Sequence, residues 1–222
     1  KPEDIIEEII LLEEENRFLL IERNGIEAYQ LSDGRPLERA KMYSSFYYQH
    51  ENKLFTVNKE GKLAAYNMKD LEQVTVYDTD AVIQGYLSGD EKTLIGISQD
   101  KTGFSYDIET KTRSELGWSG ELLVTNEQGT KYLVADVSAN QVSIYPFDGT
   151  KPEASIEIKA NFIKAAGFSP DGKMLFVSLR DGCTKIYKTD GLALIKTVEN
   201  TPNVDKWDKV SADNMELLYN KA

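Results

Sequence analysis

The sequence predicts an all-β fold made of repeated four-stranded antiparallel sheets, and three observations carry this prediction. A motif of about 40 residues recurs along the chain. Each copy contains short runs in which apolar and polar residues alternate, the pattern of a strand with one buried face. Turn-forming pairs such as Asp181-Gly182 separate the runs.

The clearest copy is the stretch FSPDGKMLFVSLRDGCTKIYKTDG, residues 168–191. Its two apolar runs, MLFVS and CTKIY, are joined by Asp181-Gly182, where glycine can adopt the positive φ that a tight hairpin turn requires. A second turn, SPDG, precedes the first run, and a third, TDG, follows the second run. The stretch therefore predicts a hairpin flanked by two further turns.

The first run of this hairpin has counterparts throughout the chain. They are EEENRFLLI (13–21), YQHENKLF (48–55), SGDEKTLIG (88–96), TNEQGTKYLV (125–134) and SADNMELLY (211–219). One leucine aligns in all six copies: Leu19, Leu54, Leu94, Leu133, Leu175 and Leu217. Its spacings of 35, 40, 39, 42 and 42 residues are hard to obtain by chance.

The second run also recurs, and each copy ends near a tyrosine. The equivalent tyrosines are Tyr29, Tyr66, Tyr106, Tyr145 and Tyr187. Alternation with period two, together with β-branched and aromatic residues, favours strands. We expect this stripe of tyrosines to pack between sheets rather than to form a ligand platform.

Two more strand candidates complete each unit, as in AVIQGYL (81–87) and LEQVTVY (71–77). Four strands in about 40 residues is the spacing of a β-propeller blade. The sequence therefore predicts a single β-propeller domain over residues 1–222, with five complete blades and part of a sixth. The expected blades are 4–43, 44–79, 80–117, 118–160, 161–200 and the partial 201–222.

The partial sixth unit leaves two arrangements open. In the favoured one the chain, which begins at Lys1, is a piece of a larger protein with a ring of about six to eight blades. An incomplete ring exposes edge strands, through which it would associate with another chain or with further segments of its own. In the alternative, five blades close the ring and the last strands overlap the first blade or extend it.

The stretches SPDGKMLFVSLRDGCTKIYKTDG and SGDEKTLIGISQDKTGFSYDIET resemble the repeats of WD40- and YVTN-type β-propellers. The copy GKLAAYNMKDLEQV is also similar to a quinoprotein-type blade. The Gly-His pair of WD40 blades is absent, and the one Trp-Asp pair, Trp207-Asp208, falls in the first strand of a unit. Blade cohesion is therefore expected to come mainly from apolar packing, at about 25 cal/mol per Å² buried.

Composition narrows the possible partners. The chain has 26 basic and 37 acidic residues, a net charge of −11, which argues against binding a nucleic-acid backbone. Fully apolar runs reach only four residues, as in Ile9–Leu12, so no membrane span is predicted in this chain. The lone Cys183 is expected to be a small packed residue. Neither a cytoplasmic nor an extracellular location is favoured.

The sequence indicates no catalytic residues, no cofactor and no metal site. The sole histidine, His50, lies at a predicted turn, and no nucleophile elbow or glycine-rich phosphate loop occurs. The aspartates at 78, 80, 205 and 208 lack the pattern of a calcium loop. Glu7, Glu8 and Glu121, on expected inner strands, are candidates for facing a central channel. We therefore lean against an enzyme.

Binding is the favoured hypothesis, because propeller rims present loops on a rigid scaffold. Candidate binding residues are aromatics that break the repeat: Trp118, Trp207, Tyr47 and Tyr48. The alternative for both tryptophans is packing at blade junctions. The first function predicted is a non-enzymatic scaffold that binds a protein or small ligand at a propeller face. Alternatives are a sensory or substrate-binding ectodomain of a bacterial membrane or cell-surface protein and, less favoured, a lactonase, hydrolase or quinone-dependent enzyme.

Overall fold

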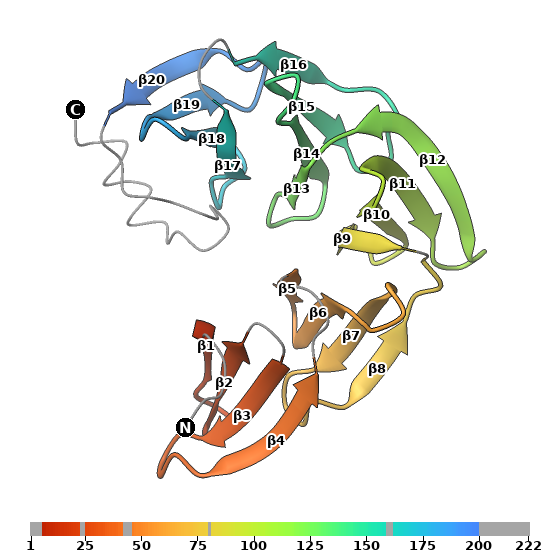
Figure 1. Ribbon diagram of the computed structural model, residues 1–222, viewed down its shortest axis with the longest axis vertical. Coiled ribbons are helices and arrows are strands. Elements are labelled where there is room, and N and C mark those ends of the chain that lie inside the picture. Colours follow the sequence, from red (N-terminus) through yellow and green to blue (C-terminus); the bar gives the residue numbers. More distant parts are fainter. Residues whose placement is uncertain (1–5, 23–24, 42–45, 80, 159–161, 200–222) are drawn as a thin grey trace. The chain divides into compact units, whose positions relative to one another are not determined.

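The structure, a computed structural model, describes residues 6–22, 25–41, 46–79, 81–158 and 162–199 (Figure 1). The chain divides into two compact units, Lys1–Gly85 and Tyr86–Ala222, and each is described by itself. The described ranges hold twenty strands and no helix, and hence no helix long and apolar enough to cross a membrane. The partial sixth unit lies outside the described residues.

The first unit contains two four-stranded antiparallel sheets in which the strands follow chain order. The first sheet is β1 (Ile6–Leu12), β2 (Arg17–Glu22), β3 (Gly25–Gln30) and β4 (Pro36–Lys41). The second sheet is β5 (Tyr47–His50), β6 (Lys53–Val57), β7 (Leu63–Asn67) and β8 (Gln73–Val76). In both sheets the fourth strand is an edge and is mostly exposed.

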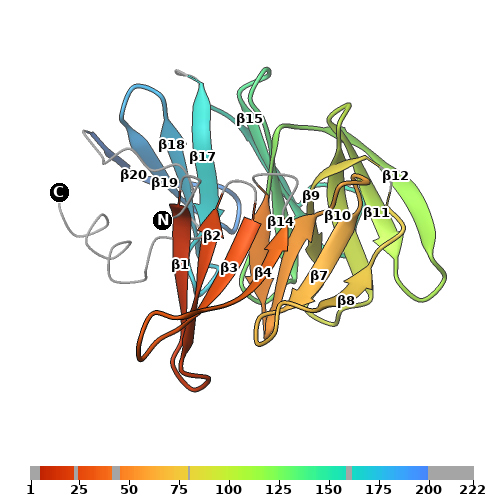
Figure 2. The same cartoon turned by 60° about the horizontal axis from the view of Figure 1, so that its bottom comes forward.

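Three more sheets of the same kind follow. The third sheet is β9 (Val82–Leu87), in which the boundary between the units falls, β10 (Thr93–Ser98), β11 (Thr102–Asp107) and β12 (Thr112–Ser119). The fourth is β13 (Leu122–Thr125), β14 (Lys131–Asp136), β15 (Gln141–Pro146) and β16 (Ala154–Glu157). The fifth is β17 (Ile163–Phe168), β18 (Met174–Leu179), β19 (Thr184–Lys188) and β20 (Leu194–Val198). Figure 2 shows strands β1 to β4 of the first sheet side by side in a second view.

The predicted all-β class and the five four-stranded antiparallel sheets are confirmed. How the sheets are arranged around an axis stays a proposal. The strand bounds differ from the expected blades in one place that matters for function. Strand β12 continues to Ser119, past the expected boundary after residue 117, so Trp118 ends the third sheet instead of beginning the fourth.

The turns of the best repeat are confirmed. Gly172, Gly182 and Gly191 have φ of 69°, 85° and 71°, the left-handed region that glycine tolerates. At the hairpin turn the Cys183 N–H donates to Oδ1 of Asp181 at 3.0 Å. A side chain that accepts a bond from the backbone two residues on is a common device of tight turns, and it explains why Asp-Gly occurs here.

The strand register corrects one part of the repeat alignment. Leu54, Leu94 and Leu175 pair with the repeat tyrosines of their sheets, as the alignment expects. In the first and fourth sheets, however, the tyrosines pair with Phe18 and Tyr132, so the aligned Leu19 and Leu133 are wrong by one residue. A slip of one residue places a side chain on the opposite face. Leu19 and Leu133 are also fully buried, so hydrophobicity alone could not reveal the slip.

The first unit has its core between its two sheets. Leu19 and Ile21 of β2 and Ile26 of β3 meet Leu54 of β6, and all four side chains are fully buried. Because alternate residues of a strand share a face, Leu19 and Ile21 point together toward the second sheet. Tyr47 of β5 belongs to the same core.

A large core of the second unit lies between the fourth and fifth sheets. From the fourth sheet it contains Leu133, Ala135, Val142 and Ile144. From the fifth it contains Ile163, Ala166, Phe168, Leu175, Val177, Leu179 and Tyr187. Branched aliphatic side chains from two facing sheets interdigitate here, as in other stacked sheets. This contact fixes the fifth sheet against the fourth.

Equivalent turns of three successive sheets also touch, in a series that we name the turn row (residues 88–91, 126–130 and 169–173). The Gly89 N–H donates to the Gly129 carbonyl at 2.9 Å. The Gln128 side-chain Nε2 donates to the Pro170 carbonyl at 3.1 Å. A Cβ at residue 89 would lie 2.2 Å from the Gln128 carbonyl oxygen, so this approach requires glycine.

Candidate functional site

Trp118, the first predicted binding residue, packs between the third and fourth sheets. Its indole is 5.9 Å from the ring of Tyr132 and 6.0 Å from the ring of Tyr145, between centroids, and its Nε1–H donates to Oη of Tyr132 at 3.3 Å. Beneath it lies Gly103 of β11, where a Cβ would come within 2.4 Å of three indole carbons. These contacts place Trp118 against the next sheet, which is compatible with the packing alternative. The Trp118 side chain is only partly buried, and its binding role stays a prediction.

Tyr132 is the centre of this aromatic cluster. Its ring is fully buried and stacks on Tyr145 with the centroids 5.0 Å apart and the planes 3° apart. Burial raises the pKa of Tyr132 to about 12, against the smaller opposing effect of the bond from Trp118. The phenol therefore stays neutral and can donate to the Gly149 carbonyl, 3.4 Å away.

Tyr47 and Tyr48 do not form one surface. Tyr47 is 4% exposed in the core of the first unit, whereas Tyr48 is half-buried and stacks on Phe55 with centroids 4.7 Å apart. Successive residues of a strand point to opposite faces, so one partner on one face of the sheet cannot contact both rings. Trp207, the fourth predicted binding residue, lies outside the described residues.

Glu121 lies immediately before β13 and links two turns. Its carboxylate accepts bonds from Lys101 Nζ at 2.9 Å, the Val137 N–H at 2.8 Å and the Ser138 hydroxyl at 3.2 Å. Burial opposes ionisation, but these bonds together lower the pKa of Glu121 below its usual value. A carboxylate held in this way joins the β10–β11 turn to the β14–β15 turn. Glu121, which was considered as a channel candidate, therefore has a structural role.

Cys183 is half-buried beside the core of the fourth and fifth sheets. Burial, and then the carboxylate of Asp181, raise the pKa of its thiol. The thiolate is the reactive form of cysteine, so this environment makes Cys183 a packing residue at neutral pH.

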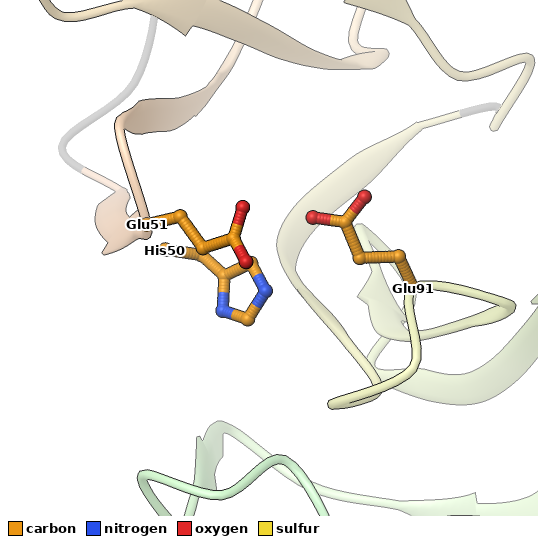
Figure 3. A group of neighbouring side chains, drawn as sticks. All are labelled: His50, Glu51 and Glu91. Atoms are coloured by element: carbon orange, nitrogen blue, oxygen red, sulfur yellow. The ribbon is translucent and has the colours of Figure 1, made fainter.

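His50 and Glu51 lie at the turn between β5 and β6, and Glu91 lies in the turn between β9 and β10 (Figure 3). The three residues are of types that bind metals. His50 and Glu51 belong to the first unit and Glu91 to the second, so no metal site is assigned to them.

A cavity of about 440 Å³ lies at one end of the fourth and fifth sheets, entirely within the second unit. Its lining residues are Lys131, Gly172, Lys173, Met174, Lys188, Thr189, Asp190 and Ile195. They come from the start of β14, the β17–β18 turn, the start of β18, the end of β19, the β19–β20 turn and the start of β20. The volume lies in the range of small-molecule sites, and we name this feature the lysine cavity.

The local structure explains how these residues come together. The Ser169 hydroxyl accepts the Met174 N–H at 2.9 Å and donates to Asp171, closing the turn that carries Gly172 and Lys173. The Thr189 N–H donates to the Lys173 carbonyl at 2.9 Å, which holds the end of β19 beside that turn. The lysine cavity is thus built on hydrogen-bonded turns that tertiary contacts support.

No signal in the sequence singled out the lysine cavity. Its lysines are widely separated in the chain, and isolated lysines on a solvated surface are common. The serine-to-glycine turn was predicted, but its position beside the end of β19 follows from sheet pairing across the fifth sheet.

No protein-family model and no curated protein matches this chain.

Proposed function

We propose that the chain is a non-enzymatic binding module and that its five sheets are blades of a β-propeller of the kind that WD40- and YVTN-type repeats form. The repeat along the sequence and the five identical sheet topologies support the proposal. A repeated scaffold of this kind carries its recognition surface on the turns that connect the strands.

The turn row is the observation that carries the proposal. Turns at the same position of three successive sheets are joined by the Gly89–Gly129 and Gln128–Pro170 hydrogen bonds. Such a row offers a continuous surface of backbone groups and short polar side chains on a rigid support. The lysine cavity adjoins it through Gly172 and Lys173.

The arrangement of the blades is tested by an experimental structure of the chain. We expect the sheets to lie radially about a shared axis, with the innermost strand of each sheet nearest that axis. Sheets stacked as a flat sandwich, or two units that turn independently, would contradict the propeller.

The binding role is tested by titrating ¹⁵N-labelled chain with a small-fragment library and following amide chemical shifts. We expect the shifts to concentrate in the turn row and around the lysine cavity. The non-enzymatic part is tested with generic ester and lactone substrates. Turnover that disappears in His50→Ala would show that the chain is an enzyme.

A further inference from the structure

The charge around the lysine cavity differs from that of the chain as a whole. The chain carries a net charge of −11, yet three of the eight lining residues are lysines and one is an aspartate, Asp190. A cavity lined by an excess of one sign of charge favours ligands of the opposite sign. The lining itself therefore favours an anion.

Two of the three lysines also have carboxylate neighbours. Lys131 forms an ion pair with Glu153, and Lys173 Nζ lies 3.4 Å from Asp171. Both pairs are partly exposed, and such pairs stabilise a protein little, so an anionic ligand can compete for the two ammonium groups. No carboxylate of the described residues pairs with the third lysine, Lys188.

Thr189 supplies a second, independent observation. It lines the cavity and is 9% exposed, and its Oγ1 has no hydrogen-bond partner among the described residues. A buried hydroxyl without a partner costs free energy, and a ligand oxygen that reached this buried atom from the cavity would relieve that cost. Its backbone bond to the Lys173 carbonyl places it beside one of the lysines.

Apolar groups form the remaining wall. Met174 and Ile195 line the cavity, and Ile195 is 36% exposed, which is high for an isoleucine. A ligand that covered this wall would bury apolar surface as well as gain the charged contacts. An inorganic ion alone would leave the wall uncovered.

We propose that the lysine cavity binds a small organic oxyanion, with its phosphate or carboxylate oxygens on the lysines and Thr189 and its apolar part on Met174 and Ile195. The inference rests on the proposed binding role, to which it adds the chemical class of the ligand. Phosphate and carboxylate present the same acceptor oxygens to lysine and hydroxyl donors.

The test uses phenyl phosphate, benzoate and benzylamine, added to the full chain and followed by ¹⁵N amide shifts and calorimetry. We expect one or both anions to shift residues 131, 172–174 and 188–190 in the millimolar range, and the cation benzylamine to leave them unchanged. The responses to phenyl phosphate and to benzoate show whether the cavity prefers a phosphate or a carboxylate. Raising the salt concentration from 50 to 300 mM should weaken binding severalfold.

Two variants identify the contacts, with Lys185→Gln on the same strand as the control. Lys188→Gln should weaken anion binding about fivefold, and Lys185→Gln should leave it unchanged. Thr189→Val should also weaken binding about fivefold while the free protein keeps or gains thermal stability, because a buried hydroxyl without a partner is removed. If Thr189 had only a structural role, its replacement would not weaken anion binding while thermal stability was kept or increased.

Two results would overturn the anion site. One is no shift at these residues with either anion at 20 mM or so, a concentration that reveals even weak binding. The other is binding that neither Lys188→Gln nor Thr189→Val changes. Fragment binding elsewhere in the turn row would leave the binding module standing in either case, so the two proposals fail separately.

Discussion

The two contacts between sheets in the second unit solve the same packing problem with different side chains. Between the third and fourth sheets, Trp118, Tyr132 and Tyr145 meet over Gly103. Between the fourth and fifth sheets, aliphatic side chains such as Leu133 and Leu175 interdigitate. The fourth sheet takes part in both, because its strands present tyrosines on one face and aliphatic residues on the other.

The difference separates two ways of stabilising one repeat. The aromatic contact depends on shape, since a large ring fits only where the facing residue has no Cβ. The aliphatic contact depends on filled volume, since its side chains approach complete burial from both sheets. The two contacts should therefore respond to different substitutions.

The largest effect is expected in the aliphatic contact. Leu175→Ala removes a fully buried side chain and should lower the free energy of unfolding by about 3 kcal/mol in urea titration. The control Leu194→Ala, at a position 55% exposed, should change it by less than about 0.5 kcal/mol. Equal effects at the two positions would contradict the assigned core.

The next largest effect is expected in the aromatic contact, at the glycine that faces the ring of Trp118. Gly103→Ala should lower the free energy of unfolding by about 2 kcal/mol, because the new Cβ overlaps the indole. Trp118→Leu in the same chain should relieve most of this loss, whereas Ser105→Ala on the same strand should cost little. The same loss in the presence and absence of Trp118 would show that the ring does not cause it.

A smaller effect follows from the pKa of Tyr132. The folded-state pKa, about 12, lies above the usual value of 10.0, so folding favours the neutral phenol. That contribution is fully present below pH 10 and is lost as the pH rises toward 12. We expect Tyr132→Phe to flatten the fall in stability over this range, measured by urea unfolding at several pH values. Absorbance at 295 nm should show the delayed ionisation directly.

The smallest effect is expected in the turn row, which connects the third, fourth and fifth sheets. Bonds from the Ser88 and Ser169 hydroxyls, followed by backbone N–H groups, lower the pKa of Asp90 and of Asp171. Their contribution to stability is present above pH 4 or so and is lost as the pH falls through the folded-state values. Asp90→Asn and Asp171→Asn should each reduce the acid dependence of thermal stability slightly and equally. A clear dependence on only one aspartate would mean that the two turns are not equivalent.

Much of the fold could be predicted because its signals are local. The alternating runs, the Asp-Gly turn and the repeated tyrosines predicted five antiparallel sheets, and the sheets are confirmed. Strand ends were less certain, as β12 and Trp118 show, because a strand continues wherever a neighbour offers hydrogen bonds. The predicted binding residues stay a prediction, and their packing was not foreseen. Trp118 packs against Tyr132, Tyr47 lies in the core of the first unit, and the lysine cavity was not anticipated.

By itself the sequence determined where strands and turns occur, because alternation and positive-φ glycines act over a few residues. Tertiary structure alone decided which leucine of each repeat faces which sheet, and that Gly103 lies beneath Trp118. It also brought Lys131, Lys173 and Lys188 to one cavity. These outcomes depend on register and on packing between residues far apart in the chain, and short-range patterns carry no information about either.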